Sequence, residues 1–168
     1  MTAQLISTPY HVPNGGGPAR WHLGALLTFK ATASQTGGRL WAKELLAERG
    51  MATPMHRHSR EDEAFYVLEG EISVHVGDDI VRARQGDFLW APRDVGHAFC
   101  VESARARVLV VSTPAGFEQF FFNTGQPATE LTVPPADAAP SDPNSLISAL
   151  ASYEVEVLGP PPSPITAC

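Results

Sequence analysis

The sequence is poor in cysteine, in long apolar runs and, over its last third, in basic residues. Its 168 residues include only two cysteines, Cys100 and Cys168, which excludes a disulfide framework and suits a reducing compartment. No apolar run approaches the roughly 18 residues of a membrane helix. The first residues also lack the basic region of a secretory signal. We therefore expect a cytoplasmic protein that does not enter the membrane.

Charge is distributed unevenly along the chain. Twelve Lys and Arg residues stand against 18 Asp and Glu residues, a net charge of -6. A surface that neutralises phosphates is not expected, so nucleic acid is excluded as a partner. Residues 112–168 contain no Lys or Arg, six acids and 10 of the 15 prolines. They can form an acidic interaction tail, but we favour an extension that packs on the domain, because it carries apolar anchors such as Phe117, Leu146 and Val157.

Short segments typical of β-strands, separated by Gly and Asp turns, follow one another from Arg39 onward. They lie at 39–46, 55–58, 64–68, 71–76, 80–84, 88–91, 98–102 and 107–112. Such short strands at close spacing predict an all-β fold, an antiparallel sandwich or barrel. Two short helices are predicted near the C-terminus, at 117–123 and 144–153.

The chain is long enough for one domain with its own core. We expect an N-terminal arm at 1–35, a β-barrel at 36–115, and a C-terminal helical and Pro-rich extension at 116–168 packed on the barrel. The predicted core comprises Phe65, Val67, Ile72, Val74, Phe88, Phe99, Leu109 and Val111. Phe65, Phe88, Trp90 and Phe99 are predicted to line the barrel. Tyr66 and Leu68 should point out of it, to be covered by the extension or by a second subunit.

Three histidines and one glutamate form a candidate metal site. His56 and His58 alternate on a predicted strand, so both imidazoles point to one face. A four-residue turn then brings Glu63 to the head of a strand on whose inward face Phe65 follows. A buried carboxylate needs a partner, and a metal held by the two histidines would be one. His97 heads another strand and completes a set that suits a divalent transition metal: iron, manganese, nickel, cobalt, copper or zinc.

Other candidate ligands are weaker. Two acids in the turn, Glu61 and Asp62, are alternatives for the carboxylate ligand. His75 lies on the face opposite an apolar row and is predicted to be a solvated surface residue. His11 and His22 fall in the expected N-terminal arm, where the sequence suggests no role for them.

The spacing around these residues resembles both motifs of the cupin superfamily. The first motif reads Gly50, five residues, His56-Arg57-His58, four residues, Glu63, six residues, Gly70; the second reads Gly86, five residues, Pro92, then His97. Asp94 stands where cupins usually have glycine, and Cys100 replaces the usual asparagine. Asp tolerates left-handed backbone geometry better than most residues. The first departure therefore concerns the shape of the loop and leaves the spacing of the histidine unchanged.

Residues 63–68 and 116–121 are also similar to bacterial single-domain cupins related to quercetin 2,3-dioxygenase. The resemblance implies a double-stranded β-helix, or jelly-roll barrel, commonly assembled as a homodimer. It implies one divalent metal on His56, His58, Glu63 and His97. It also implies a dioxygenase that uses dioxygen on a small hydroxylated aromatic or flavonol-like substrate, with Glu63 as ligand and catalytic proton acceptor.

Two other functions fit the same ligand set. A non-redox metal enzyme, such as a polyketide cyclase or isomerase, would use the metal as a Lewis acid. A non-catalytic cupin would bind a small molecule without turning it over. Oxygen uptake on addition of substrate separates the dioxygenase from both.

Overall fold

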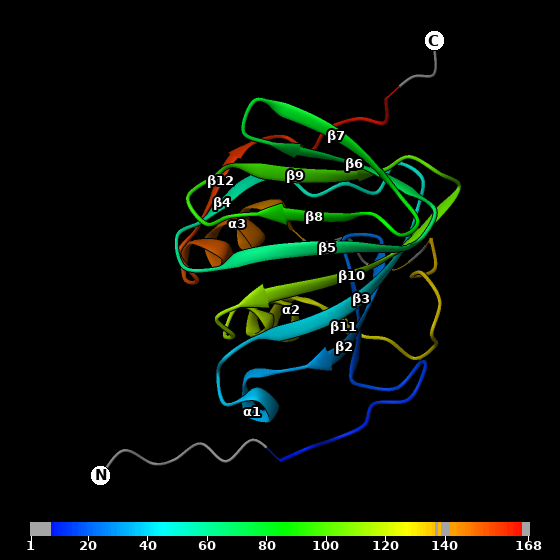
Figure 1. Ribbon diagram of the computed structural model, residues 1–168, viewed down its shortest axis with the longest axis vertical. Helices are drawn as coiled ribbons and strands as arrows, with labels where there is room; N and C mark the ends of the chain where they lie inside the picture. The colour runs from blue at the N-terminus through cyan, green and yellow to red at the C-terminus, as the bar shows by residue number, and fades with distance from the viewer. Residues whose placement is uncertain (1–7, 137, 139–141, 166–168) are drawn as a thin grey trace.

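Two antiparallel sheets stacked along the long axis of the molecule make up its framework (Figure 1). The computed structural model describes residues 8–136, 138 and 142–165. The larger sheet has the order β11-β1-β2-β3-β10-β5-β8, and the smaller has the order β12-β4-β9-β6-β7. Strands dominate and the helices are short, which confirms the predicted all-β class. Within the described residues, no helix is both long and apolar enough to cross a membrane.

The elements have the following bounds. The larger sheet contains β1 (Ala19–His22), β2 (Ala25–Ala31), β3 (Trp41–Glu48), β5 (Asp62–Glu69), β8 (Phe88–Ala91), β10 (Arg105–Thr113) and β11 (Gln126–Pro127). The smaller sheet contains β4 (Met55–His58), β6 (Glu71–Val76), β7 (Asp79–Arg84), β9 (His97–Val101) and β12 (Val155–Gly159). The helices are α1 (Ala33–Thr36), α2 (Glu118–Thr124) and α3 (Pro143–Ala151).

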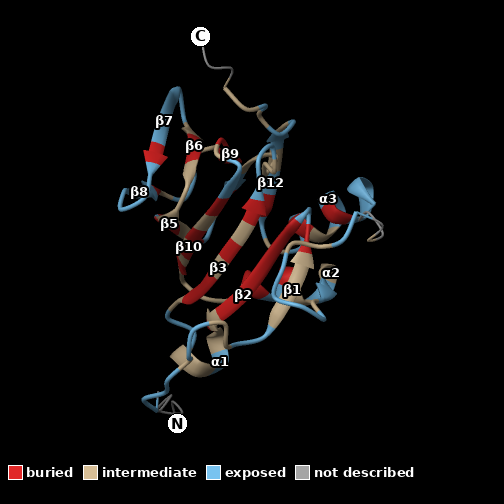
Figure 2. Ribbon diagram, turned by 90° about the vertical axis from the view of Figure 1, so that its right-hand side faces the viewer, coloured by how far each residue is buried: buried red, intermediate tan, exposed pale blue. Residues whose placement is uncertain are grey.

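The larger sheet begins earlier in the chain than expected. Strands β1 and β2 lie within the region 1–35 that we expected to form an arm, and β2 pairs with β3 along most of its length. The sequence of β2 explains this, because Leu26, Leu27 and Phe29 are all buried in the sheet. Figure 2 shows β2 and much of β3 as buried, whereas β7 is exposed over most of its length.

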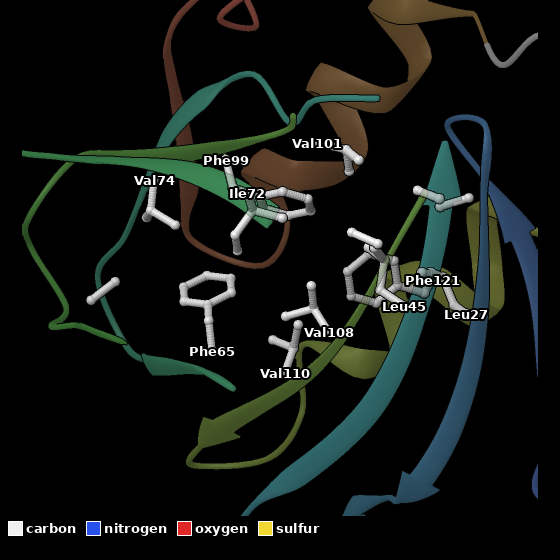
Figure 3. Packing of buried hydrophobic residues seen from close by; sticks show 14 of the residues in the cluster. Leu27, Leu45, Phe65, Ile72, Val74, Phe99, Val101, Val108, Val110 and Phe121 are labelled. Carbon is white, nitrogen blue, oxygen red and sulfur yellow. The ribbon is translucent and has the colours of Figure 1, made fainter. Parts of the chain in front are cut away.

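The core fills the space between the two sheets (Figure 3). Five of the eight residues predicted for it are buried, which confirms that part of the prediction: Phe65, Val67, Ile72, Val74 and Phe99. Figure 3 shows Phe65 from β5 and Phe99 from β9 in the same cluster. Their rings lie 6.0 Å apart.

The prediction was wrong for the phase of strand β10. Val108 and Val110 are buried, whereas Leu109 and Val111, which were expected in the core, are only partly buried. Strand β10 lies between β3 and β5 in the sheet and carries apolar residues on both faces. The alternation of side chains along this strand therefore does not indicate which of its two faces points inward.

Strand β8 was also misjudged, because it lies at the edge of the larger sheet. Phe88 is 63% exposed and Trp90 is 49% exposed, so neither lines the barrel as predicted. Tyr66 is paired with Phe88 across β5 and β8 and is 43% exposed, so its outward direction is confirmed. Together Tyr66, Phe88 and Trp90 form the outer aromatic patch.

The C-terminal region packs against the strands. Its buried apolar side chains are Phe117, Phe120, Phe121, Leu146, Leu150 and Val155. Figure 1 shows α2 and α3 behind the strands in that view. Strand β12, which was not predicted, adds to the smaller sheet beside β4.

Candidate metal centre

Three strands bring the four predicted ligands together. His56 and His58 lie on β4, Glu63 lies near the start of β5, and His97 begins β9. The register pairs His56 directly with His97 across β4 and β9. One ligand atom from each residue can be chosen so that all four lie within 4.8 Å of one another. Residues that are far apart in sequence thus form one compact donor set of three imidazoles and one carboxylate.

The loop before His97 is held against the strand of the histidines. Asp94 has a φ of 64°, the left-handed geometry for which cupins usually use glycine at this position. Its backbone N–H donates to the carbonyl oxygen of His58 at 2.8 Å. Next to it, Arg93 forms an ion pair with Asp62 at 2.7 Å. The loop therefore keeps its shape with Asp94 and ties the two motifs together.

The outer ring nitrogens of all three histidines have hydrogen-bond acceptors. Nδ1 of His56 and Nδ1 of His97 each lie close to the backbone carbonyl two residues earlier in the chain, at 2.8 and 3.1 Å. Nδ1 of His58 lies 3.3 Å from a carboxylate oxygen of Glu61. Because carbonyl and carboxylate oxygens only accept, each Nδ1 carries a proton, which leaves Nε2 as the nitrogen that can offer a lone pair to a metal. Metal-binding histidines are typically oriented in this way.

The inner nitrogens face one another and Glu63. Nε2 of His97 lies 3.3 Å from Oε2 of Glu63, and Nε2 of His58 lies 3.9 Å from Oε1. Nε2 of His58 is buried and has no hydrogen-bond partner among the described residues. Such an atom is rare in a native interior, and a metal ion would satisfy it. The four residues therefore fit a divalent transition metal.

The two alternative acids have other tasks. Glu61 is buried behind His58 and contacts the ring nitrogen that faces away from the centre. Asp62 accepts hydrogen bonds from Arg93 on the outside of the barrel. Neither acid belongs to the cluster that could hold an ion. Glu63 is thus the only carboxylate that the described structure places among the three Nε2 atoms.

Burial and charge set the protonation states of the cluster. Burial, together with the neighbouring imidazoles, lowers the pKa of His56 to about 3. Burial alone would raise the pKa of Glu63, but His58 and a hydrogen bond from His97 hold it well below its usual range. Burial alone would lower the pKa of His97, but the hydrogen bond and charge of Glu63 raise it. At neutral pH His56 is therefore neutral and Glu63 ionised, the forms in which both bind metals.

The cluster opens into an apolar cavity of about 540 Å³. His56 and Glu63 form part of its wall, and the side chains of α2, α3 and the segment after β12 form much of the rest. Its apolar lining includes Phe65, Phe99, Phe117, Phe120, Phe121, Leu146, Ile147 and Leu150. The cavity therefore offers a flat or apolar molecule direct access to the donor set.

Two polar residues in the cavity wall were missed by the sequence analysis. His22, which was given no role, is buried, and its Nε2 lies 3.1 Å from the hydroxyl of Thr124. Burial and the nearby charge of Lys43 lower the pKa of His22 to about 4. Lys43 itself is buried on β3 and also lines the cavity. The sequence could have indicated the burial of Lys43, because Lys43 lies on the same strand face as Trp41 and Leu45, two buried apolar residues.

The remaining histidines lie outside the donor set. His75 is half-buried on β6, and its partners across the sheet are Ile80 and Ala98. His11 is exposed in the segment that precedes β1. Neither residue belongs to the cluster that could hold a metal.

Comparison with known proteins places this geometry in context. A family model described as "Cupin domain" matches residues 43–112. The quercetin 2,3-dioxygenase of Bacillus subtilis (strain 168) is 26% identical over 121 residues, which are 72% of this chain and 36% of that protein. The quercetin 2,3-dioxygenase of Aspergillus japonicus is 30% identical over 112 residues, which are 60% of this chain and 32% of that protein. The chain thus spans about a third of the length of these two relatives.

The fold is also found in solved structures. KdgF from Halomonas sp. superposes with a TM-score of 0.60 at 21% identity, covering 67% of this chain and 99% of that protein. An RmlC-like cupin from Shewanella frigidimarina NCIMB 400 superposes with a TM-score of 0.58 at 20% identity, covering 68% of this chain and 99% of that protein. These likenesses confirm the predicted cupin-type fold.

Proposed function

Because the chain belongs to the cupin superfamily, we propose that it is a metal-dependent dioxygenase of the quercetinase-like type. In this proposal His56, His58, Glu63 and His97 bind one divalent transition metal. The substrate is a small hydroxylated aromatic or flavonol-like compound, and dioxygen is the second substrate. The observation that carries the proposal is that the four converging donors open directly into an apolar cavity of about 540 Å³.

A divalent ion at this position would supply Lewis acidity, which favours the deprotonated form of a substrate hydroxyl. The protein supplies the acceptor for the proton. Glu63 is ionised, lies among the three Nε2 atoms and also lines the cavity. Its carboxylate can therefore accept the proton when the hydroxyl reaches the centre. The deprotonated substrate then reacts with dioxygen: a carbon–carbon bond is cleaved and both oxygen atoms of dioxygen enter the products, so that the substrate is oxidised as dioxygen is reduced.

The walls of the cavity determine which molecules reach this carboxylate. Phe65 and Phe99 line it on the barrel side, and Phe117 and Phe120 line it on the side of α2. Apolar walls favour a flat aromatic body and exclude water, which strengthens the electrostatic interactions of the donors. The names of the two curated relatives, both quercetin 2,3-dioxygenases, support a flavonol as the first substrate to test.

Oxygen uptake tests the proposal. The purified protein, loaded in turn with iron, manganese, nickel, cobalt, copper or zinc, is mixed with quercetin and with simpler hydroxylated aromatics in an oxygen-electrode cell. We expect stoichiometric oxygen uptake with at least one metal, and none with His56→Ala. Turnover without oxygen uptake would favour a cyclase or isomerase. Binding without turnover of any compound would favour a non-catalytic cupin.

The expected cytoplasmic location and homodimer remain predictions. The first rests on the low cysteine content. The second is supported by the outer aromatic patch of Tyr66, Phe88 and Trp90, which nothing in the described chain covers. Exposed apolar patches of this kind are typical of contact surfaces.

A further inference from the structure

Lys43 is a charged residue in an apolar position. It lies on the inward face of β3, and its neighbours across the sheet are Phe29 on β2 and Val110 on β10. Only 6% of its surface is exposed. Lysine is almost never buried to this extent unless it is paired. The side chain lines the same cavity as His56 and Glu63.

The ammonium group of Lys43 has aromatic neighbours and, among the residues that the structure describes, no ion-pair partner. Its Nζ lies 3.4 Å from the ring centroid of Phe121 and 5.1 Å from that of Trp41. Within the described chain, no carboxylate comes within ion-pair distance of this nitrogen. Glu63 is close enough to favour the charged form of Lys43, but its oxygens face the histidines. The aromatic rings stabilise the cation in part, and the side chain of Lys43 forms part of the cavity wall.

The other lysine of the chain shows the contrast. Lys30 forms an ion pair with Glu44 at 3.3 Å and donates to the backbone carbonyl of Gly16 at 3.0 Å. Burial lowers the pKa of Lys43 to about 7, although the charge of Glu63 acts in the opposite direction. A buried charge without a partner is costly for the folded protein. A cavity that retains such a group is thus suited to a ligand that brings the missing negative charge.

We propose that Lys43 binds an oxyanion of the substrate, a carboxylate or an ionised hydroxyl. The cavity would then select flat apolar molecules with an acidic group. This inference rests on the proposed function, because it concerns the substrate of the same site.

The sheet geometry gives the spacing that such a substrate must meet. Strands β3 and β5 are separated only by β10. At the usual strand spacing, Lys43 and Glu63 are therefore anchored on strands about 10 Å apart. One acidic group of the substrate would contact Lys43, while a different oxygen of the same molecule would reach the centre at Glu63. The aromatic body would lie between them against Phe65 and Phe121, which line the cavity.

Binding of a matched pair of probes tests the inference. Zinc-loaded protein is titrated calorimetrically with 2-naphthoate and with its neutral counterpart 2-naphthamide. We expect the parent to bind the anion about tenfold more tightly, a modest value for a charge-assisted contact. Lys43→Met and Lys43→Gln should show a clearly smaller preference than the parent but still bind the amide. Lys30→Met, which removes the other lysine, should keep it.

The zinc ion can also attract a carboxylate, but it is present in the parent and in every variant. Its contribution to the anion preference is therefore the same in each protein, and a difference between parent and variant reports on Lys43. A preference that is as large in both Lys43 variants as in the parent would overturn the inference, because the anion would then be bound by another group. A parent protein without any preference would also overturn it.

A second measurement does not depend on a variant that folds. The chain has only two lysines, so peptide mapping after treatment with acetic anhydride reports directly on Lys43. We expect 2-naphthoate, but not 2-naphthamide, to protect Lys43, with Lys30 unaffected by either. Equal modification of Lys43 with and without naphthoate would contradict the inference. Neither test measures oxygen uptake, so a failed dioxygenase assay and a failed anion preference are separate results.

Discussion

A carboxylate oxygen of Glu61 lies 3.3 Å from Nδ1 of His58, on the far side of the ring from Glu63. Both residues are buried, and the contact orients the imidazole so that Nε2 points into the centre. Glu61, two positions before Glu63, thus lies behind one of the proposed metal ligands. Partners of this kind fix the tautomer and the orientation of metal-binding histidines.

Glu61→Ala should therefore weaken metal binding without removing a ligand. Loss of such a partner typically costs about 10–100-fold in metal affinity, which a competition titration with a chelating dye would measure. Asp62→Asn is the matched control, because it changes the neighbouring acid, whose partner is Arg93 on the outside. Equal affinities of the parent and the Glu61 variant would show that His58 is oriented by other contacts.

Removing a ligand should have a larger effect. His56→Ala and His97→Ala each delete one Nε2 from the cluster, so we expect severe loss of metal from the purified protein in elemental analysis. His75→Ala changes a half-buried histidine outside the cluster and should leave the metal content unchanged. Similar losses from all three variants would place the centre elsewhere.

Glu63→Gln should separate metal binding from proton transfer. Three histidines can hold a divalent metal, so the variant should retain much of its metal. It lacks the ionised oxygen that accepts the proton, and loss of a general base lowers turnover by about 10²–10⁴-fold. Turnover and metal content measured on the same preparation test this expectation. Turnover at the parent rate with normal metal content would show that Glu63 is not the proton acceptor.

The stability of the protein should depend on pH through Lys43. Burial lowers its pKa to about 7, from 10.5 in a free side chain. Between these two values the unfolded chain binds more protons at this residue than the folded protein. Stability therefore rises with pH across the window, and the cost of burying the charge is fully present below pH 7. This cost is on the order of a few kcal/mol.

Lys43→Met removes this dependence. We expect the variant to be more stable than the parent at pH 6, with the difference shrinking as the pH approaches 10.5. Denaturant unfolding of both proteins at several pH values, without added metal, measures it. A constant difference between the two proteins would mean that the ammonium group is not buried at a cost.

The outer aromatic patch predicts the oligomeric state. If a second copy covers Tyr66, Phe88 and Trp90, light scattering at micromolar concentration should give the mass of a dimer. Phe88→Ser, at the most exposed of the three, should then shift the mass toward a monomer without lowering the metal content. A parent protein that is already monomeric would contradict the predicted homodimer.

The sequence allowed the donor set to be predicted because its spacing encodes local geometry. A two-residue interval on β4 and a short turn to β5 fix the directions of His56, His58 and Glu63, whatever the rest of the chain does. His97 was identified through the second motif. Nothing in those intervals indicates which more distant strands will form the wall of the cavity.

The features that were missed depend on tertiary packing. Lys43 and His22 became cavity residues because β1 and β2 extend the sheet and α2 packs beside them. Strand β10 could not be oriented, because both of its faces are apolar. Phe88 was placed in the core because hydrophobicity alone does not distinguish an edge strand from an interior strand.

Strand β12 has a consequence for the order in which the centre can form during synthesis. Val157 and Val155 pair with His56 and His58, and an ion pair joins Arg57 to Glu156, 99 positions apart in the chain. On its other side, β4 pairs with β9 only through His56 and His97. The strand that carries two of the proposed ligands therefore acquires its longer neighbour only after the chain has been made as far as residue 159. Contacts between such distant segments form slowly, so a nascent chain that already contains all four proposed ligands still lacks the strand that pairs with two of them.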